Sequence, residues 1–428
     1  MSPTVRRVTD TTSQELLSAP LSDRPCLDSL QEARRDRDAG TEARAAGFWL
    51  LAYLFAAVML GTTLPTPLYV IYQANWHFSS EVVTLVFATY AAGVLAALLL
   101  AGRSSDQVGR RPVLGTALGL GALSTLVFIL APSLGWLFVG RALSGLAAGL
   151  VTGTATAAIT DAGTDERRSS RVATAANTGG LALGPLVAGL FAEFGPNPTV
   201  LIFEVYLGIL VLASLALLLV PETVVDRQAL SLRFSGLGIP TIGRPEYLAA
   251  GLAGFAAFSL LGLFSALAPS FLGQVLHERN HAVEGAVVFI LFASSTVTQL
   301  LAARFKSRPV VLFGLATFLV ALALIVAGLS AASMALFLAG TIVGGIGAGG
   351  VFMGSLSTAN RLAPPEQRGR VVSTYFVFCY VGLTIPVIGV GIASVHVGDF
   401  RAVLACAVGL AVLSVISMAG ILRAAPTR

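Results

Sequence analysis

The sequence predicts an all-α membrane protein with twelve transmembrane helices, arranged as two pseudo-symmetric six-helix bundles. Three observations predict this class: an apolar composition, apolar runs of membrane-spanning length, and weak repetition between the two halves. Of the 428 residues, 55% are hydrophobic and only 11% are charged, whereas about 25% of the residues of a soluble domain are charged. Such a chain cannot cover a water-facing surface. This excludes a soluble enzyme, a nucleic-acid-binding protein and a secreted disulfide-rich domain.

The N-terminal segment differs from the rest of the chain. Residues 1–46 contain seven Arg and eight Asp or Glu without a sustained apolar period, and this composition predicts a disordered tail. No apolar core follows a short basic start, so we do not expect a signal peptide. The first transmembrane helix should follow the tail directly.

From residue 47 on, apolar runs long enough to cross about 30 Å of hydrocarbon recur through the chain. Proline cannot donate a backbone hydrogen bond, so Pro65 and Pro67 are expected to break the first run. Only residues 304–308 separate the eighth run from the ninth, and a single long run is the alternative there. We predict transmembrane helices at 47–71, 80–102, 111–131, 135–160, 170–194, 199–220, 246–272, 283–303, 309–329, 333–358, 370–395 and 399–423.

The basic residues predict the orientation of the chain. Of the 27 Arg and Lys residues, 24 fall in the two termini or in loops on the same side, and two, Arg279 and Arg401, fall on the opposite side. Arginine-rich loops stay in the cytoplasm. We therefore expect a multi-pass protein of the cell membrane, inner or plasma, with both termini cytoplasmic. The basic residues then mark topology, and no nucleic-acid partner is expected.

The two halves resemble each other weakly. Arg-Pro-Val at 111–113 recurs at 308–310, the glycine-rich segment that starts at Arg141 aligns with the one at Gly340, and Pro185 aligns with Pro386. Such repetition predicts two homologous bundles with a substrate path between them. The predicted domains are a disordered cytoplasmic tail (1–46), an N-terminal six-helix bundle (47–220), a cytoplasmic linker (221–245), a C-terminal six-helix bundle (246–423) and a cytoplasmic C-terminus (424–428).

The most specific motif lies between the second and third helices. It reads Gly102-Arg-Ser-Ser-Asp106-Gln-Val-Gly109-Arg110-Arg111. Gly109 is expected to adopt a positive φ. Every fixed position of the loop is similar to the G-x-x-x-D-x-x-G-R-[RK] signature of the major facilitator superfamily, and with the helix pattern the resemblance covers 47–423. It implies the major facilitator fold. A loop that only fixes topology is the alternative.

The resemblance also implies a conformational latch at this loop. It places Asp106 on the start of the eleventh helix, at residues 369–373, and pairs Arg110 with Asp161 at the end of the fourth helix. These contacts are expected to hold the cytoplasmic side shut when the protein faces outward. The expected latch residues are Gly102, Asp106, Gly109, Arg110, Arg111 and Asp161.

Arg141 lies within the fourth helix, where an unpaired charge is costly. The segment around Arg141 and Gly145 resembles the family's fourth-helix motif, with Ser144 in place of the usual Gln, and implies a part in proton coupling. Glu204 within the sixth helix and Glu193 near the end of the fifth are the candidate acids, which would neutralise Arg141 or carry the proton. An arginine that extends to the membrane interface is the alternative.

The fifth helix carries Gly180, Gly184, Pro185 and Gly189, small residues spaced for close helix packing and a proline that bends the helix. The segment resembles the fifth-helix element of exporters that work as antiporters, with Ala188 in place of one Gly. It favours efflux and resembles the 12-helix drug/proton antiporter branch. Generic helix packing is the alternative.

Two further motifs are expected to carry no chemistry. His277-Glu-Arg-Asn-His281 matches the HExxH zinc-protease motif, but it falls in an outer loop without a recognisable third ligand. An intramembrane metalloprotease is therefore a remote alternative. Gly345-x-Gly347-x-x-Gly350 matches a dinucleotide fingerprint, but it lies inside an apolar helix. We expect no metal, no cofactor and no enzymatic activity.

The resemblance places the first, fourth, seventh and tenth helices along the central path. Their side chains are apolar with scattered hydroxyl groups, which favours a hydrophobic substrate over a sugar. The candidate path residues are Thr62, Thr63, Tyr69, Thr152, Phe255, Phe258, Ser265 and Thr341.

The sequence therefore predicts a monomeric secondary active transporter that works by alternating access. We expect proton-coupled efflux of a hydrophobic drug-like compound or metabolite, with a small-molecule substrate, protons and the lipid bilayer as partners. Uptake of a small metabolite by proton symport is the alternative. The first helix lacks the carboxylate that many drug–proton antiporters have there, which argues against proton antiport.

Overall fold

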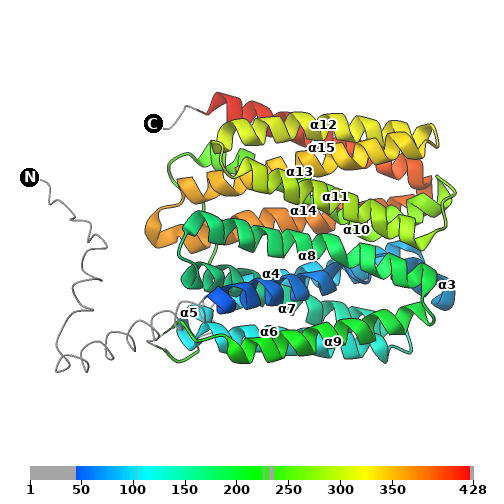
Figure 1. Cartoon of the computed structure of the whole chain (residues 1–428). Coiled ribbons are helices and arrows are strands. Elements are labelled where there is room, and N and C mark those ends of the chain that lie inside the picture. The colour runs from blue at the N-terminus through cyan, green and yellow to red at the C-terminus, as the bar shows by residue number, and fades with distance from the viewer. Residues whose placement is uncertain (1–44, 103, 225–226, 231–235, 425–428) are drawn as a thin grey trace, which may run out of the picture.

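The computed structural model describes residues 45–102, 104–224, 227–230 and 236–424 (Figure 1). The predicted disordered tail, except for its last two residues, lies outside them. Within the described residues, twelve helices are long and apolar enough to cross a membrane. The predicted all-α class with twelve spans is therefore confirmed.

The helices follow the predicted order. The first span covers Ala45–Trp76 and ends with α3 (Leu68–Trp76). The elements that follow are α4 (Ser80–Ala101), α5 (Ser104–Val108), α6 (Arg110–Ile129), α7 (Leu134–Ala162), α8 (Glu166–Phe194), α9 (Pro198–Leu219), α10 (Arg244–Gln274), α11 (His281–Ala302), α12 (Ser307–Ser330), α13 (Met334–Leu362), η2 (Pro365–Gln367), α14 (Arg368–Val397) and α15 (Asp399–Arg423). Because α11 and α12 are separate helices, the alternative of a single long run is wrong.

The first span is broken where the sequence predicts a break. Its helix ends in a turn that contains Pro65 and Pro67, and α3 follows. In an α-helix the Thr66 N–H would donate to the Thr62 carbonyl. Here it donates to the Thr63 carbonyl at 3.0 Å, one residue closer. The break therefore leaves the Thr62 carbonyl without its helical donor.

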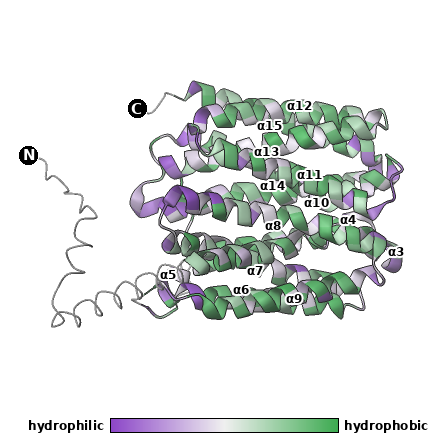
Figure 2. Cartoon of the chain, viewed as in Figure 1, coloured by the Kyte–Doolittle hydropathy of each residue, from purple (hydrophilic) through white to green (hydrophobic). Residues whose placement is uncertain are grey.

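The helices run between two ends of the molecule. We call the end that holds α5 and the starts of α6 and α14 the linker end, and the opposite end, with α3, the far end (Figure 1). Figure 2 shows that hydrophilic residues gather at the ends, most of all at the linker end, and that the helices between them are mostly hydrophobic. Apolar side chains of α9 such as Leu212 and Leu215 are exposed, which fits contact with lipid.

The two bundles pack their fourth helices alike at an offset of 200 residues. α7 begins and ends 200 residues before α13. Gly140 and Gly340 face the equivalent helices α6 and α12. Gly145 with Gly345, and Gly149 with Gly349, face α4 and α11. Arg141 therefore corresponds to Thr341, and the sequence alignment with Gly340 was wrong by one residue. A segment rich in Gly and Ala matches itself almost as well after a shift of one, so contacts are needed to fix the register.

The two bundles touch each other near the far end. Gly189 of α8 and Gly285 of α11 bring two helix backbones together, and a Cβ on Gly189 would lie 2.5 Å from the His281 carbonyl oxygen. Gly391 of α14 packs against Thr84 of α4, where an added Cβ would lie 2.6 Å from the threonine methyl group. Each contact joins a helix of the N-terminal half to a helix of the C-terminal half.

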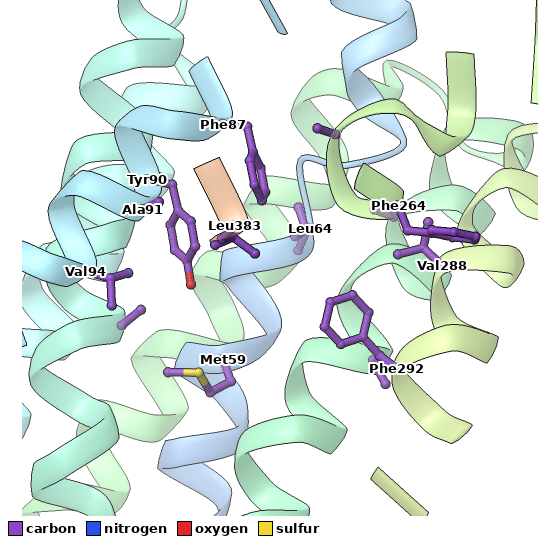
Figure 3. Close-up of a cluster of buried hydrophobic side chains, with 14 of the residues drawn as sticks. Met59, Leu64, Phe87, Tyr90, Ala91, Val94, Phe264, Val288, Phe292 and Leu383 are labelled. Carbon is purple, nitrogen blue, oxygen red and sulfur yellow. The ribbon is translucent and has the colours of Figure 1, made fainter. Parts of the chain in front are cut away.

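Apolar side chains from both bundles are buried together at the same end. Leu64 of the broken span, Phe87 of α4, Phe264 of α10, Val288 of α11 and Leu383 of α14 belong to the buried core that both bundles share, and we call these five residues the far-end seal. In the view of Figure 3, Leu64 lies between Phe87 and Leu383 on one side and Phe264 and Val288 on the other. Removing this apolar surface from water stabilises the contact between the bundles.

The close contact at Gly189 predicts an opposite response at two glycines of α8. Gly189→Ala would press a methyl group against the α11 backbone and should increase the separation of the bundles at the far end. Gly179→Ala is the matched control, because no atom lies within 4 Å of a Cβ there. Alanine should instead stabilise the helix at that position, by up to about 1 kcal/mol.

Spin labels at Phe194 and Arg279, two exposed residues at the far end, report the separation by double electron–electron resonance once the native cysteines are replaced. We expect longer distances in Gly189→Ala than in Gly179→Ala. Identical distance distributions would contradict a role of this contact in closing the far end.

Candidate transport path and conformational latch

Arg141 is completely buried in α7 and is held by neutral groups. Its Nε donates to the Tyr69 hydroxyl and its Nη1 to the Thr62 carbonyl, both at 2.5 Å. The rings of Tyr69, Phe87 and Tyr90 have their centres 5.3–5.9 Å from the guanidinium carbon, within the range of cation–π attraction. The remaining nitrogen, Nη2, has no hydrogen-bond partner among the described residues.

The broken first span supplies two of these contacts. The break frees the Thr62 carbonyl for Arg141, and Tyr69 comes from α3 after the break. The sequence proposed Thr62 and Tyr69 as path residues and Arg141 as a coupling residue, and the structure joins them in one cage. Phe87 and Tyr90 of α4 were missed. The sequence signal that could have identified them is a pair of aromatic residues three positions apart in the predicted helix 80–102.

The structure does not bring the two candidate acids to Arg141. Glu204 is exposed on α9 and makes no hydrogen bond or ion pair within the described part of the chain. Glu193 is exposed at the far end of α8, where it accepts a hydrogen bond from the His281 N–H at 2.9 Å. The expected neutralisation of Arg141 by Glu204 or Glu193 is therefore absent from this structure.

Glu193 belongs to a titratable cluster at the contact between α8 and α11. The Glu284 carboxylate is 1% exposed, and its Oε2 lies 2.9 Å from His281 Nδ1. Asn280 caps α11 by accepting a hydrogen bond from the Val283 N–H at 3.1 Å. The bond from His281 to Glu193 crosses from one bundle to the other. This cluster therefore sits on the contact that closes the far end.

The HExxH motif does not form a zinc site. A metalloprotease motif needs both histidines on one helical face, whereas residues 277–280 are non-helical and α11 begins only at His281. His277 also adopts a positive φ of 56°. In the described ranges, no group of three or more His, Cys, Asp or Glu side chains is placed to hold a metal ion. The metalloprotease alternative is therefore not supported.

The predicted path residues fall into two groups. Half-buried side chains are found at Thr152, Phe255 and Phe258, and buried ones at Thr62, Thr63, Tyr69, Ser265 and Thr341. The Thr63 hydroxyl donates to the Leu181 carbonyl of α8 at 2.8 Å, so it ties two helices together. On α7, the exposed residues Gly153, Thr156 and Thr160 continue the face of Thr152 toward the linker end, and no atom lies within 4 Å of a Cβ at Gly153.

Four aromatic rings of the C-terminal bundle, which include the predicted path residue Phe258, lie close to one another. The ring centres of Phe258 and Tyr380 are 5.8 Å apart, and those of Phe258 and Phe352 are 5.4 Å apart. Phe376 lies 6.5 Å from Phe352. We call Phe258, Phe352, Phe376 and Tyr380 the aromatic wall; of these, the sequence identified Phe258.

The latch loop is bonded within its own bundle. Arg110 contacts the Asp106 carboxylate at 2.5 Å and the Asp161 carboxylate at 3.2 Å. Its Nη1 also donates to the Ser105 hydroxyl at 2.8 Å. Gly109 has a φ of +110°, which confirms the expected positive value. Arg111 donates to the Leu218 carbonyl at the end of α9, and Gly102 ends α4.

A linker residue that the sequence analysis missed completes this network. The Glu222 carboxylate accepts hydrogen bonds from the Arg110 and Arg111 N–H groups at 2.9 and 3.0 Å, at the start of α6. A Cβ on Gly109 would lie 2.5 Å from Oε2 of Glu222. Gly109 is therefore needed both for its φ and for the room it leaves. Burial acts to raise the pKa of Glu222, but backbone donors outweigh it and lower the pKa below its ordinary value.

The expected contact between Asp106 and the start of α14 is not made. The Asp106 side chain is 62% exposed, and its carboxylate is hydrogen-bonded to Arg110. The linker contacts the start of α14 instead. The Gly238 N–H donates to the Thr374 hydroxyl at 2.9 Å, and Arg370 donates to the Leu237 carbonyl at 3.2 Å.

Glu222 predicts a stability difference that depends on pH. Glu222→Gln removes the charge and one acceptor oxygen from a side chain that is 12% exposed, and should lower the free energy of unfolding by about 1–2 kcal/mol at pH 7. Because the pKa is lowered in the folded state, the wild-type contribution is complete above the ordinary value of 4.5 and is lost as the pH falls through the folded pKa.

Thermal unfolding in detergent across this pH range provides the measurement. The gap in Tm between wild type and Glu222→Gln should narrow as the solution becomes acidic. Glu366→Gln, at an exposed residue of the same end, is the control and should change little. A gap that widened with acid would contradict the capping role.

Comparisons with known proteins agree with this architecture. The family model "Major Facilitator Superfamily" matches residues 50–301, which is more than half of the chain, and the model "Sugar (and other) transporter" matches residues 241–421.

Solved structures of three transporters are similar along most of their length. A bacterial homolog of the human lysosomal transporter Spinster, in an inward-facing and unoccupied conformation, has a TM-score of 0.73 at 14% identity, over 90% of this chain and 99% of that one. The human organic anion transporter MFSD10 has a TM-score of 0.65 at 19% identity, over 88% and 99%. The nucleoside transporter NupG has a TM-score of 0.68 at 15% identity, over 88% and 99%. At these identities the likeness concerns the fold. Together with the family model, it shows that the chain belongs to the Major Facilitator Superfamily of membrane transporters.

Proposed function

We propose that the protein exports an apolar organic compound across the cell membrane by alternating access, driven by a proton gradient. One observation carries the proposal. The two bundles are joined at the far end by two glycine contacts and an apolar seal, while Arg110 and Arg111 at the linker end bond to groups of their own bundle and to Glu222 of the linker. A transporter that rocks between two states would be closed at the far end and released at the linker end in one of them.

The orientation follows from the arginines. With the linker end in the cytoplasm, the described state is inward-facing, which also agrees with the inward-facing conformation of the similar Spinster homolog. The uncovered face of α7 at Thr156 and Thr160 then opens to the cytoplasm. Threonine and glycine on this face suit a hydrated path better than contact with lipid tails.

The aromatic wall supports an organic substrate with apolar or aromatic surface. Four rings in contact attract an apolar or aromatic substrate by stacking and dispersion, and these forces do not require one particular substrate shape. The similar transporters carry different cargo, organic anions for MFSD10 and nucleosides for NupG, so the fold alone does not select the substrate. A hydrophobic drug-like compound or metabolite remains the class that this lining favours.

The small residues of α8 support export. Gly180 and Gly184 pack against the backbone of the first span near Ala56 and Leu60, and Gly189 packs against α11. The segment that resembles the exporter element thus makes the close contacts on both sides of α8. Movement of this helix would change the far-end closure directly.

The cluster of Glu193, His281 and Glu284 is the candidate proton site. Glu284 is buried where α8 meets α11, and separation of the bundles at the far end would expose it to the outside. A carboxylate that is buried in one state and hydrated in the other binds protons with different affinity in the two states, and proton coupling requires this difference. Glu204, exposed on α9, lacks such an environment.

Substrate flux into proteoliposomes tests the proposal. The purified protein is screened with labelled hydrophobic amines, neutral aromatic compounds and organic acids, with and without an imposed pH gradient. Export by antiport predicts substrate movement against the direction of proton flow and its loss with a protonophore. Movement in the same direction as protons would favour the symport alternative. Equal rates with and without the gradient would contradict proton coupling.

The positions of the acids predict which of them couples proton movement to substrate transport. Glu284→Gln keeps the shape and removes the proton site, so gradient-driven flux should fall by about tenfold or more while substrate counterflow continues. Glu204→Gln is the matched control and should retain gradient-driven flux. Loss of driven flux in the Glu204 variant alone would return the coupling role to Glu204 and contradict the cluster.

A further inference from the structure

Arg141 carries a charge for which the described residues supply no counter-ion. Arginine stays protonated at working pH, and a fully buried charge is costly unless a partner neutralises it. The acids on the adjoining elements are distant. Asp161, on the same helix, is 20 residues away, or about 30 Å. Glu81 lies in the first turn of the adjoining α4, six residues before Phe87, or about 9 Å along the helix axis, and α3 carries no acid.

The unpartnered buried polar atoms of Arg141 and of the broken first span are all potential donors. Besides Arg141 Nη2, the buried hydroxyl groups of Thr66 and Tyr72 have no hydrogen-bond partner among the described residues. Both belong to the broken segment that holds Arg141, and Tyr72 follows Tyr69, which bonds the guanidinium, by one turn of α3. A guanidinium N–H group and hydroxyl groups without partners define a site that lacks a negatively charged acceptor.

We propose that the Arg141 cage is a binding subsite for a monovalent anionic group. The group is either the carboxylate of the transported compound or a free inorganic anion such as chloride. In the first case the inference deepens the proposed function, because the substrate is then an apolar or aromatic compound with one negative charge.

The charge and shape of the cage set the class of ligand. A single uncompensated guanidinium matches one negative charge, and Nη2 offers its donors to one small group. The surrounding rings of Tyr69, Phe87 and Tyr90 exclude a large hydrated anion. Tyr90 belongs to the buried apolar cluster against which Tyr380 of the aromatic wall packs, so we infer that an aromatic body lies toward the wall while its carboxylate binds Arg141.

The far-end seal controls access to this subsite. Phe87 belongs both to the seal and to the cage, and Arg141 is completely buried while the seal is closed. Separation of α4 from α14 at the far end would uncover the guanidinium. A free inorganic anion would enter from the outside in that state, whereas the carboxylate of an exported compound would be released there.

Ligand binding to the purified protein tests the subsite without measuring transport. The probes are sodium benzoate, its neutral analogue benzamide, and sodium chloride, with ionic strength fixed by sodium gluconate. Trp76 stacks on Tyr72 with ring centres 5.0 Å apart, so its fluorescence reports on the site after Trp49 and Trp136 are replaced by Phe. Tm is measured in parallel.

The variants distinguish the effect of losing the Arg141 charge from the effect of misfolding. Arg141→Gln should abolish the response to benzoate, whereas Arg401→Gln, which removes an exposed arginine of the same end, should leave it unchanged. Tyr72→Phe and Thr66→Val keep the guanidinium and should weaken binding by severalfold. They keep the test decisive if Arg141→Gln fails to fold.

The probes separate the two sources of the anion. A response to benzoate and not to benzamide, competed by chloride only weakly, supports the carboxylate of a substrate. A response to chloride alone supports a free anion. Equal responses to benzoate and benzamide, or equal responses of wild type, Tyr72→Phe and Thr66→Val, would overturn the subsite. Because no flux is measured, anion binding can fail while transport succeeds, and the reverse.

Discussion

The two prolines of the first span determine much of the far-end architecture. A membrane helix must satisfy its carbonyls internally, and Pro65 and Pro67 make that impossible over one turn. The Thr66 N–H moves to a nearer acceptor, and the released Thr62 carbonyl becomes available to a side chain from another helix. Arg141 fills that place. The buried guanidinium thus gains an acceptor, and the carbonyl released by the break gains a donor.

The same break also orients the apolar groups around the charge. It carries Leu64 into the seal between the bundles and starts α3, which directs Tyr69 onto the guanidinium. The cage and the seal are therefore parts of one local structure. A movement that opens the seal must also change the surroundings of Arg141, which links closure of the path to an electrostatic event.

The two ends of the molecule rely on different forces. The far end is closed by glycine contacts and apolar burial, whereas the linker end is tied by ion pairs within each half. Asp161 pairs with Arg110, and at the equivalent place 200 residues later Arg361 pairs with Glu246 at 2.6 Å. The signs of the charges are exchanged, but each pair binds the end of a fourth helix to its own bundle. Each half can then move as a unit.

The sequence predicted the elements well and the contacts less well. Span number, the break at Pro65 and the positive φ of Gly109 follow from rules that act within a few residues. Partners of side chains depend on packing between distant segments. Glu204 looked like the partner of Arg141 because both are charges in apolar runs, but it faces outward from α9. Glu222 looked like an ordinary linker acid, and only the fold brings it to the start of α6.

The equivalence of Arg141 and Thr341 has a consequence for how such a molecule arises. Two copies of one ancestral bundle would begin with the same residue at both positions. The glycine contacts of α7 and α13 still match, so the packing of the copies has stayed alike while their polar groups diverged. As a result, one half carries a buried positive charge at a position where the other half, packed in the same way, carries a neutral threonine. The polar groups of two such halves can therefore differ while the contacts between their helices stay alike.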